Sequence, residues 1–183
     1  MRRSLGTSVD EPAEVEVTRM RRRHLKGVMA IERQVYPRPW SPNLFLSEMS
    51  ELRNRTYLVA KSGRDIVGYG GMMCYGEEAH VTNIAVDPAQ HRKKIATRLL
   101  YELVTDAIRQ GAHTISLEVR VSNWGAQRLY SRFGFRPIHV RKGYYQETNE
   151  DALVMWADGI RTREYRERLA RIISQVPGAL RPH

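Results

Sequence analysis

The stretch Thr82–Leu100 constrains the possible fold more than any other part of the chain. Its apolar run, Ile84–Val86, stops at Asp87-Pro88, because proline cannot extend a central strand. A basic loop, His91–Lys94, then leads into residues whose apolar members recur at three- and four-residue spacing, which predicts a helix. A strand, a basic loop and a helix start in this order aim free backbone N–H groups and the positive helix end at one place. The stretch therefore predicts a phosphate site, with pyrophosphate as the first candidate ligand.

A plainer interpretation of the same loop stays open, because Lys and Arg at such a turn also serve solubility alone. The loop lacks the glycines and the Gly-Lys-Ser/Thr ending of a Walker motif, and the chain has no G-x-G-x-x-G run. These absences argue against a nucleoside triphosphate or a dinucleotide as the ligand.

The 183 residues suit one domain with a core of its own. Cys74 is the one cysteine, which excludes an internal disulfide framework and fits a reducing compartment. The first residues include arginines without the apolar run of a signal peptide, and no stretch approaches the roughly 20 apolar residues that cross a bilayer. We therefore expect a cytoplasmic protein with no membrane partner.

The net charge of +10 is concentrated at the two ends of the chain. Residues 1–26 hold seven Lys or Arg against four Asp or Glu, and residues 161–183 hold six against two. The body between them is close to balanced. The basic ends are candidates for contact with RNA, with a ribosome or with another acidic surface, and solvated tails are the alternative.

The pattern of apolar residues and turn residues predicts an α/β mixture of the α+β kind, with hairpins in place of a repeating β-α-β wind. Residues 1–13 are expected to be a disordered leader, 14–158 a single domain, and 159–183 an arginine-rich amphipathic tail. The expected strands are residues 14–17, 56–61, 66–75, 79–86, 113–119, 136–140 and 152–156, the last two joined by Lys142–Tyr145 and an acidic loop. The expected helices start after Thr18, at Ser41 or Asn43, near Lys94 (to Gln110), at Ser122 or Asn123 (to Gly134) and at Ile160 (to Ile173).

Three residues beyond the basic loop are candidates for chemistry, and each also has a purely structural interpretation. Glu118 ends a strand on its polar face, where it could simply alternate outward. Asn123 opens a helix and could serve only as its N-cap. Tyr130 follows Asn123 by two helical turns, on the same face, and could be a core aromatic. The six histidines include no pair at three- or four-residue spacing, so no metal site is expected.

Six motifs together resemble the GCN5-related N-acetyltransferases (GNAT), and within them the ribosomal-protein-alanine N-acetyltransferase branch. They are I-E-R (Ile31–Arg33), P-W-S (Pro39–Ser41), N-I-A-V-D-P (Asn83–Pro88), L-E-V-R-V-S-N (Leu117–Asn123), L-Y-S-R-F-G-F (Leu129–Phe135) and Tyr144-Tyr145. The resemblance covers about residues 14–157. It implies one domain with a central, mostly antiparallel sheet of about seven strands, which contains a splayed parallel pair and is flanked by helices.

The resemblance also implies a site for acetyl-CoA as co-substrate. Glu118 would be the general base and Tyr130 the general acid, and Asn123 would contact the cofactor. The pantetheine arm would lie along the backbone of Ile84, Ala85 and Val86. The pyrophosphate would rest in a cradle made of Arg92, Lys93, Lys94, Ile95, Ala96 and Thr97.

The chemistry of acyl transfer agrees with these roles. An α-amine has a pKa near ~8, so at neutral pH it must lose a proton before it can attack a thioester. A carboxylate such as Glu118 can take that proton, but with a pKa near ~4.3 it is a weak base unless burial raises that value. A neutral tyrosine such as Tyr130, with a pKa near ~10, can protonate the departing thiolate.

One position departs from the family pattern Gln/Arg-x-x-Gly-x-Gly/Ala. The chain reads His91-Arg92-Lys93-Lys94-Ile95-Ala96, so the first glycine is replaced by Lys94. Glycine allows the closest backbone approach to phosphate. Lysine crowds that approach and adds charge, so the sign of its effect on cofactor affinity stays open.

The resemblance predicts an enzyme that acetylates a protein N-terminal amine, most specifically the N-terminal alanine of ribosomal protein S18 of the small subunit. The peptide would enter a groove between Trp40-Ser41 and Tyr144-Tyr145. Two alternatives are kept: acetylation of a small-molecule amine or a lysine side chain, and a non-catalytic module that binds acyl-CoA or RNA. A basic enzyme gains no long-range attraction to a basic ribosomal protein, so specificity would have to come from short-range contacts.

Overall fold

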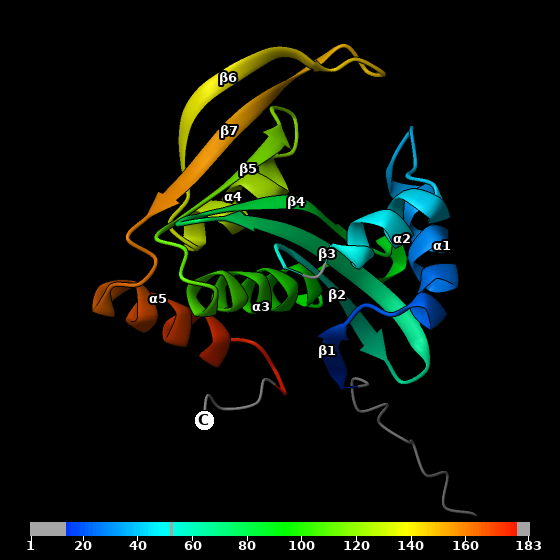
Figure 1. The fold of residues 1–183 in the computed structure, drawn as a ribbon, viewed down its shortest axis with the longest axis horizontal. Coiled ribbons are helices and arrows are strands. Elements are labelled where there is room, and N and C mark those ends of the chain that lie inside the picture. Colours follow the sequence, from blue (N-terminus) through cyan, green and yellow to red (C-terminus); the bar gives the residue numbers. More distant parts are fainter. Residues whose placement is uncertain (1–13, 52, 179–183) are drawn as a thin grey trace, which may run out of the picture.

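The computed structural model describes residues 14–51 and 53–178, and the expected leader at residues 1–13 lies outside them. One seven-stranded sheet has the order β1-β2-β3-β4-β5-β7-β6, with helices on both faces (Figure 1). The strands are β1 (Val15–Arg19), β2 (Arg55–Ser62), β3 (Asp65–Tyr75), β4 (Glu78–Val86), β5 (Thr114–Arg120), β6 (Arg136–Tyr145) and β7 (Glu150–Asp158). The helices are α1 (Leu25–Val35), α2 (Pro42–Ser50), α3 (Ile95–Arg109), α4 (Trp124–Arg132) and α5 (Arg163–Ser174), with 3-10 turns η1 (Arg22–His24) and η2 (Pro88–Gln90).

Five of the six neighbouring strand pairs are antiparallel, and β4 with β5 is the parallel pair. The chain leaves β4 through η2, crosses in α3 and returns in β5, and such a crossover produces a parallel pair. The predicted class, a mostly antiparallel sheet of about seven strands with one parallel pair, is confirmed.

Alternation along β2 shows how the two faces of the sheet are covered. Leu58 and Ala60 pack in the cluster that contains the apolar face of α3, whereas Tyr57 and Val59 pack in the cluster that contains α1 and α2. Successive side chains of a strand point to opposite faces, so one strand feeds two cores. In Figure 1, α1 and α2 lie on one side of the sheet, and α3 and α5 lie on the other.

The glycines of β3 set how closely α3 approaches the sheet. A Cβ at Gly68 would lie 3.0 Å from Cγ2 of Ile95, and one at Gly70 would lie 3.1 Å from a methyl carbon of Leu103. The absence of these Cβ atoms lets the helix lie directly on the strand, which fixes the position of the α3 start relative to β4.

The arginine-rich helix α5 packs on the same face as α3. Tyr165, Leu169 and Ile172 are buried in the core cluster of α3, and the Tyr165 hydroxyl donates to the Phe133 carbonyl oxygen at 2.6 Å. The predicted amphipathic helix is present, and its apolar face covers this chain's own core.

Two local predictions are wrong. Thr18 caps no helix, because it lies in β1 opposite Val59, and the chain enters α1 only after η1. Tyr144 and Tyr145 belong to strand β6 and not to a connecting loop, since Tyr145 pairs with Glu150 of β7. The end of β6 is polar and contains a glycine, so its sequence does not indicate a strand. Pairing with β7 makes this segment a strand.

Candidate active site

The parallel pair β4–β5 separates partway along its length. Pairing runs from Glu78 opposite Thr114 to His80 opposite Ser116, and among the described residues β4 pairs no further with β5. A cleft of about 380 Å³ opens where the strands diverge. It is lined by both strands, by the segment after α1, by α4 and by the β6–β7 hairpin that projects over it (Figure 1). The splay predicted for the parallel pair is present.

Glu118 of β5 lines this cleft, with 14% of its side chain exposed. Its Oε2 lies 3.0 Å from Nε2 of His80, and its Oε1 accepts a hydrogen bond from Nη1 of Arg141 at 2.9 Å. His80 first, and Arg141 after it, lower the pKa of Glu118 below its ordinary value, although burial acts in the opposite direction. Glu118 is therefore a carboxylate at neutral pH, able to accept a proton but held in its charged form.

Tyr130 and Asn123 of the α4 region line the same cleft. The Tyr130 ring is buried, with its centroid 5.9 Å from that of Phe135. Burial raises the pKa of Tyr130 far above its ordinary value, so its hydroxyl stays protonated and can donate. Asn123 is the N-cap of α4, since its Oδ1 accepts from the backbone N–H of Ala126 at 3.1 Å. The cap uses the amide oxygen and leaves the amide nitrogen as the group for the cleft.

Tyr36, directly after α1, is a cleft residue that the sequence did not reveal. Its hydroxyl donates to the Ile84 carbonyl oxygen at 3.5 Å, on the open part of β4. Burial, with smaller effects from Tyr130 and Glu32, raises the pKa of Tyr36 well above its ordinary value. Burial also raises the pKa of Tyr144 and Tyr145, so the four tyrosines that line the cleft are all neutral phenols.

Glu32 holds one wall of the cleft in place from a buried position, with 1% of the residue exposed. Its Oε1 accepts from the backbone N–H of Trp40 at 2.8 Å, and its Oε2 accepts from the Tyr69 hydroxyl. Burial raises the pKa of Glu32, and the hydrogen bond from Trp40 opposes that change. The I-E-R motif therefore positions the P-W-S motif at the cleft.

The opposite wall is formed by the tyrosine pair of β6. The Arg120 guanidinium lies 3.9 Å from the Tyr145 ring centroid, and its nitrogens lie 2.7 Å from Glu147 and 3.2 Å from Glu150. The Arg141 guanidinium lies 4.6 Å from the Tyr144 ring centroid. Stacking and ion pairing of this kind orient aromatic side chains, so Trp40 and the tyrosine pair face one cleft.

The basic loop has an unusual backbone at the start of α3. Lys94 is the N-cap residue with φ 62° and ψ 16°, and Arg92 has φ 63°. Both lie in the left-handed region that favours glycine. Helix α3 has no acidic residue in its first turn, so its free N–H groups and its dipole are not offset there.

The sequence-predicted site residues form two groups, one in the cleft and one beyond it at the end of β4 and the start of α3. Glu118, Tyr130, Asn123 and Ile84 line the cleft together. The others continue past it along β4 and into the loop: Ala85, Val86, Arg92, Lys93, Lys94, Ile95, Ala96 and Thr97. Ala85, Ile95 and Thr97 have buried side chains, so their backbone groups are what they can offer to a ligand.

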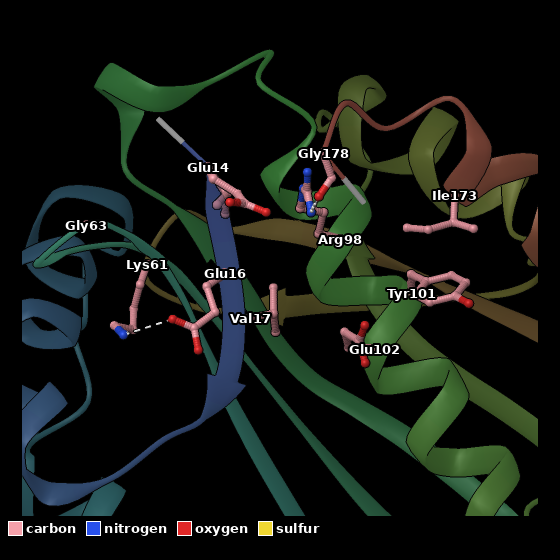
Figure 2. Close-up of a pocket in the computed structure, with 11 residues that line it drawn as sticks. Glu14, Glu16, Val17, Lys61, Gly63, Arg98, Tyr101, Glu102, Ile173 and Gly178 are labelled. Atoms are coloured by element: carbon pink, nitrogen blue, oxygen red, sulfur yellow. Dashed lines mark hydrogen bonds and ion pairs between the residues drawn. The ribbon is translucent and has the colours of Figure 1, made fainter. Parts of the chain in front are cut away.

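A second cavity, of about 450 Å³, lies between β1, α3 and the end of α5 (Figure 2). It is larger than the cleft, but it contains none of the predicted site residues. Glu14, Glu16 and Glu102 line it, and Glu16 pairs with Lys61 at 3.1 Å. Three carboxylates disfavour a phosphate ligand, so the smaller cleft between β4 and β5 is the candidate active site.

Within residues 14–51 and 53–178, no helix is long and apolar enough to span a membrane. The same residues contain no cluster of three or more His, Cys, Asp or Glu side chains with the arrangement of a metal site.

Comparison with known proteins agrees with the geometry. The family model described as the acetyltransferase (GNAT) family matches residues 25–135. The [ribosomal protein bS18]-alanine N-acetyltransferase of Escherichia coli K12 is 33% identical over 133 residues, which are 72% of this chain and 88% of that protein. The N-alpha-acetyltransferase RimI of Mycobacterium tuberculosis is 39% identical over 124 residues, 66% of this chain and 76% of the relative.

Among solved structures, the ribosomal-protein-S18-alanine N-acetyltransferase of E. coli superposes with a TM-score of 0.72 at 28% identity. The match covers 79% of this chain and 94% of that one. The resemblance expected from the sequence motifs, to this family and to this branch of it, is confirmed.

Proposed function

The chain belongs to the acetyltransferase (GNAT) family, and from that premise we propose that it moves an acetyl group from acetyl-CoA to the α-amine of a protein N-terminus. One observation carries the proposal: the divergence of β4 from β5 brings a carboxylate, Glu118, and a neutral phenol, Tyr130, to one cleft. Acyl transfer to an amine needs a proton acceptor and a proton donor of these kinds.

The residues present suit acetyl-CoA. After His80, β4 stays paired with β3 but has no β5 partner, so its backbone groups on that side would be available to an extended pantetheine arm. Farther along, Arg92 and Lys93 directly precede Lys94, the N-cap residue of α3, whose free N–H groups suit a pyrophosphate. When bound, acetyl-CoA supplies a thioester carbonyl that an uncharged amine can attack.

The chain's own residues would manage the protons of this reaction. The Glu118 carboxylate would take one proton from the substrate ammonium, directly or through a water molecule, and so free the nitrogen lone pair. The Tyr130 hydroxyl would donate to the departing sulfur. A free backbone N–H of Ile84–Val86 would donate to the carbonyl oxygen as negative charge develops there.

For the substrate we propose the N-terminal alanine of ribosomal protein S18. The relative with 33% sequence identity and the solved structure with 28% sequence identity are both named for that activity. The groove between Trp40 and the pair Tyr144-Tyr145 offers aromatic walls to an extended peptide. An activity on a ribosomal protein would also require the cytoplasmic location that the sequence predicts.

The test is turnover of acetyl-CoA with a peptide that carries the amino-terminal sequence of the host's S18. Parallel reactions contain the same peptide blocked at its α-amine, a lysine-containing peptide and a panel of polyamines and aminoglycosides. We expect product from the free α-amine peptide alone, and a loss of about 100-fold or more in kcat for Glu118→Gln. Equal turnover of the blocked peptide or of small amines would assign a different acceptor. Binding of acetyl-CoA without any turnover would indicate a non-catalytic module.

Contact with ribosomal RNA through the basic ends is a separate proposal, supported by exposed arginines of α5 such as Arg166 and Arg171. Because α5 buries Leu169 in the core, deleting residues 161–183 would test stability as well as binding. Arg166→Glu with Arg171→Glu is the cleaner change. Unaltered affinity for rRNA fragments in that double variant would remove the proposal.

A further inference from the structure

Two arginines connect the β6–β7 hairpin to β5, the strand that carries Glu118. Arg141 of β6 donates to Glu118 at 2.9 Å, and its guanidinium lies 4.6 Å from the Tyr144 ring centroid. In the other direction, the Arg120 guanidinium of β5 lies 3.9 Å from the Tyr145 ring centroid. The two tyrosine rings meet edge to face with their centroids 5.1 Å apart. The four side chains therefore form one continuous cluster between the hairpin and β5.

The hairpin has little to hold its tip in place by itself. It projects away from the body of the protein, and every residue of β6 before Tyr145 is exposed (Figure 1). The ladder between β6 and β7 is irregular between Arg141 and Tyr145, where three residues of β6 lie opposite Asp151 of β7. A segment with few buried contacts and an interrupted ladder has low local stability. Its contacts with β5 therefore decide where the two tyrosines lie.

Arg120 is the stronger of the hairpin's charged anchors. Its nitrogens lie 2.7 Å from Glu147 and 3.2 Å from Glu150, and only 20–22% of each of these three side chains is exposed. The pair Arg136–Asp158 lies on the same hairpin at 2.9 Å, but 75% and 57% of its side chains are exposed. Exposed ion pairs contribute little, whereas a guanidinium that stacks on a ring and pairs with two carboxylates has one fixed orientation.

We propose that Arg120 is a positioning residue for peptide binding, which holds Tyr145 and the hairpin tip (residues 142–149) against β5. This inference rests on the proposed function, in which the tyrosine pair forms one wall of the peptide groove. Glu118 and Arg120 are two residues apart on β5, so they point to the same face, and both line the cleft. One strand thus sets the spacing between the carboxylate and the peptide wall. A wall that is ordered in advance lowers the entropic cost of binding a peptide.

The kinetic experiment compares Arg120→Gln and Arg120→Lys with wild type in the full-length enzyme. Glutamine loses both the charge and the stacking group, whereas lysine keeps the charge and loses the planar group. We expect the KM of the free α-amine peptide to rise about 10-fold in Arg120→Gln and about three-fold in Arg120→Lys, with kcat within about three-fold of wild type. The calorimetric Kd for acetyl-CoA should stay unchanged. Arg136→Gln, which removes the exposed pair of the same hairpin, should match wild type in all three quantities.

Two further measurements show whether Arg120 acts through the hairpin. Without any substrate, the backbone amides of residues 142–149 should exchange hydrogen faster in Arg120→Gln than in wild type, and at the wild-type rate in Arg136→Gln. In a Tyr145→Leu background, the Arg120→Gln change should raise KM less than about two-fold, because the ring that Arg120 orients is already absent.

Three results would overturn the proposal. Wild-type KM and wild-type exchange rates in Arg120→Gln would show that the hairpin needs no anchor from β5. A fall in kcat with unchanged KM would show that Arg120 only maintains the fraction of folded enzyme. An equal rise in KM with and without Tyr145 would show that Arg120 contacts the peptide itself. Failure of the wild type to acetylate any amine would instead refute the proposed function, and the role in peptide binding with it.

Discussion

Replacing Lys94 by glycine should stabilise the protein relative to the same change at its neighbour Lys93. Lys94 has φ 62° and ψ 16°, where a Cβ costs roughly 1–2 kcal/mol, whereas Lys93 has no positive φ. Glycine also raises the entropy of the unfolded chain, which costs about 0.5–1 kcal/mol at either position. For Lys94→Gly, the relief of backbone strain offsets or exceeds this entropic cost, so the unfolding free energy stays level or rises. Lys93→Gly has the entropic cost alone, so its unfolding free energy should fall.

The expected difference in unfolding free energy between the two variants is therefore about 1–2 kcal/mol. For a chain of this size that difference corresponds to roughly 2–8 °C in Tm. Scanning calorimetry without acetyl-CoA is the appropriate measurement, because a bound ligand would shift Tm by itself. Lys94→Ala is the matched control: it removes the same charge but keeps a Cβ, so it should show no gain.

A Tm for Lys94→Gly at or below those of Lys93→Gly and Lys94→Ala would refute the reasoning from backbone strain. The same variants address cofactor affinity by calorimetric titration. Loss of one exposed charge should raise the Kd of Lys94→Ala for acetyl-CoA about two- to five-fold, and less so at high salt. Any further change in Lys94→Gly would measure the effect of the Cβ itself.

Three further predictions concern the cleft and the core. Tyr130→Phe should lower kcat about 10- to 100-fold. Tyr36→Phe keeps the ring and loses only a long hydrogen bond, so it should lower kcat less than about five-fold. The reverse order would assign the role of proton donor to Tyr36. Arg141→Leu should raise the pKa of Glu118, because the effect of burial is then opposed by one charge fewer. A carboxyl-carbon NMR titration should show the midpoint of Glu118 move to higher pH. A midpoint that stays or falls would contradict a stabilising role for the Arg141 charge. Leu169→Ala should cost about 2–5 kcal/mol of unfolding free energy, against less than about 0.5 for the exposed Arg171→Ala; equal, small losses would mean that α5 contributes little to the core.

The sequence predicts the elements of the fold well where local patterns and final packing agree. The helix expected at Lys94–Gln110 extends over Ile95–Arg109, and the strand expected at Ala79–Val86 starts one residue earlier. The sequence-based prediction fails where pairing with a distant strand determines the secondary structure. Thr18 has the chemistry of a cap, yet pairing with β2 extends β1 through it. The end of β6 reads as a loop until β7 pairs with it.

From the sequence, site residues could be predicted only where they lie within a recognisable motif. Glu118, Asn123 and Tyr130 lie within two such motifs, and the structure brings them to one cleft. His80 and Arg141 lie outside any motif, and their contacts with Glu118 depend on strand register and on the projection of the β6–β7 hairpin. A crossover through a helix also provides no tight turn to fix the register of the two strands, as a hairpin does.

The divergence of β4 from β5 has two consequences that a paired sheet could not provide together. It leaves the backbone of β4 beyond His80 without a strand neighbour on one side, which suits an extended ligand. It also occurs immediately after the point where His80 pairs with Ser116, so the last paired position holds His80 against Glu118 while the first unpaired ones open the cleft. The Glu118 carboxylate, for which we propose the role of proton acceptor, is therefore held by a residue of the closed part of the sheet and lines the open part. This arrangement explains how one strand pair can keep a carboxylate rigid and still admit a substrate beside it.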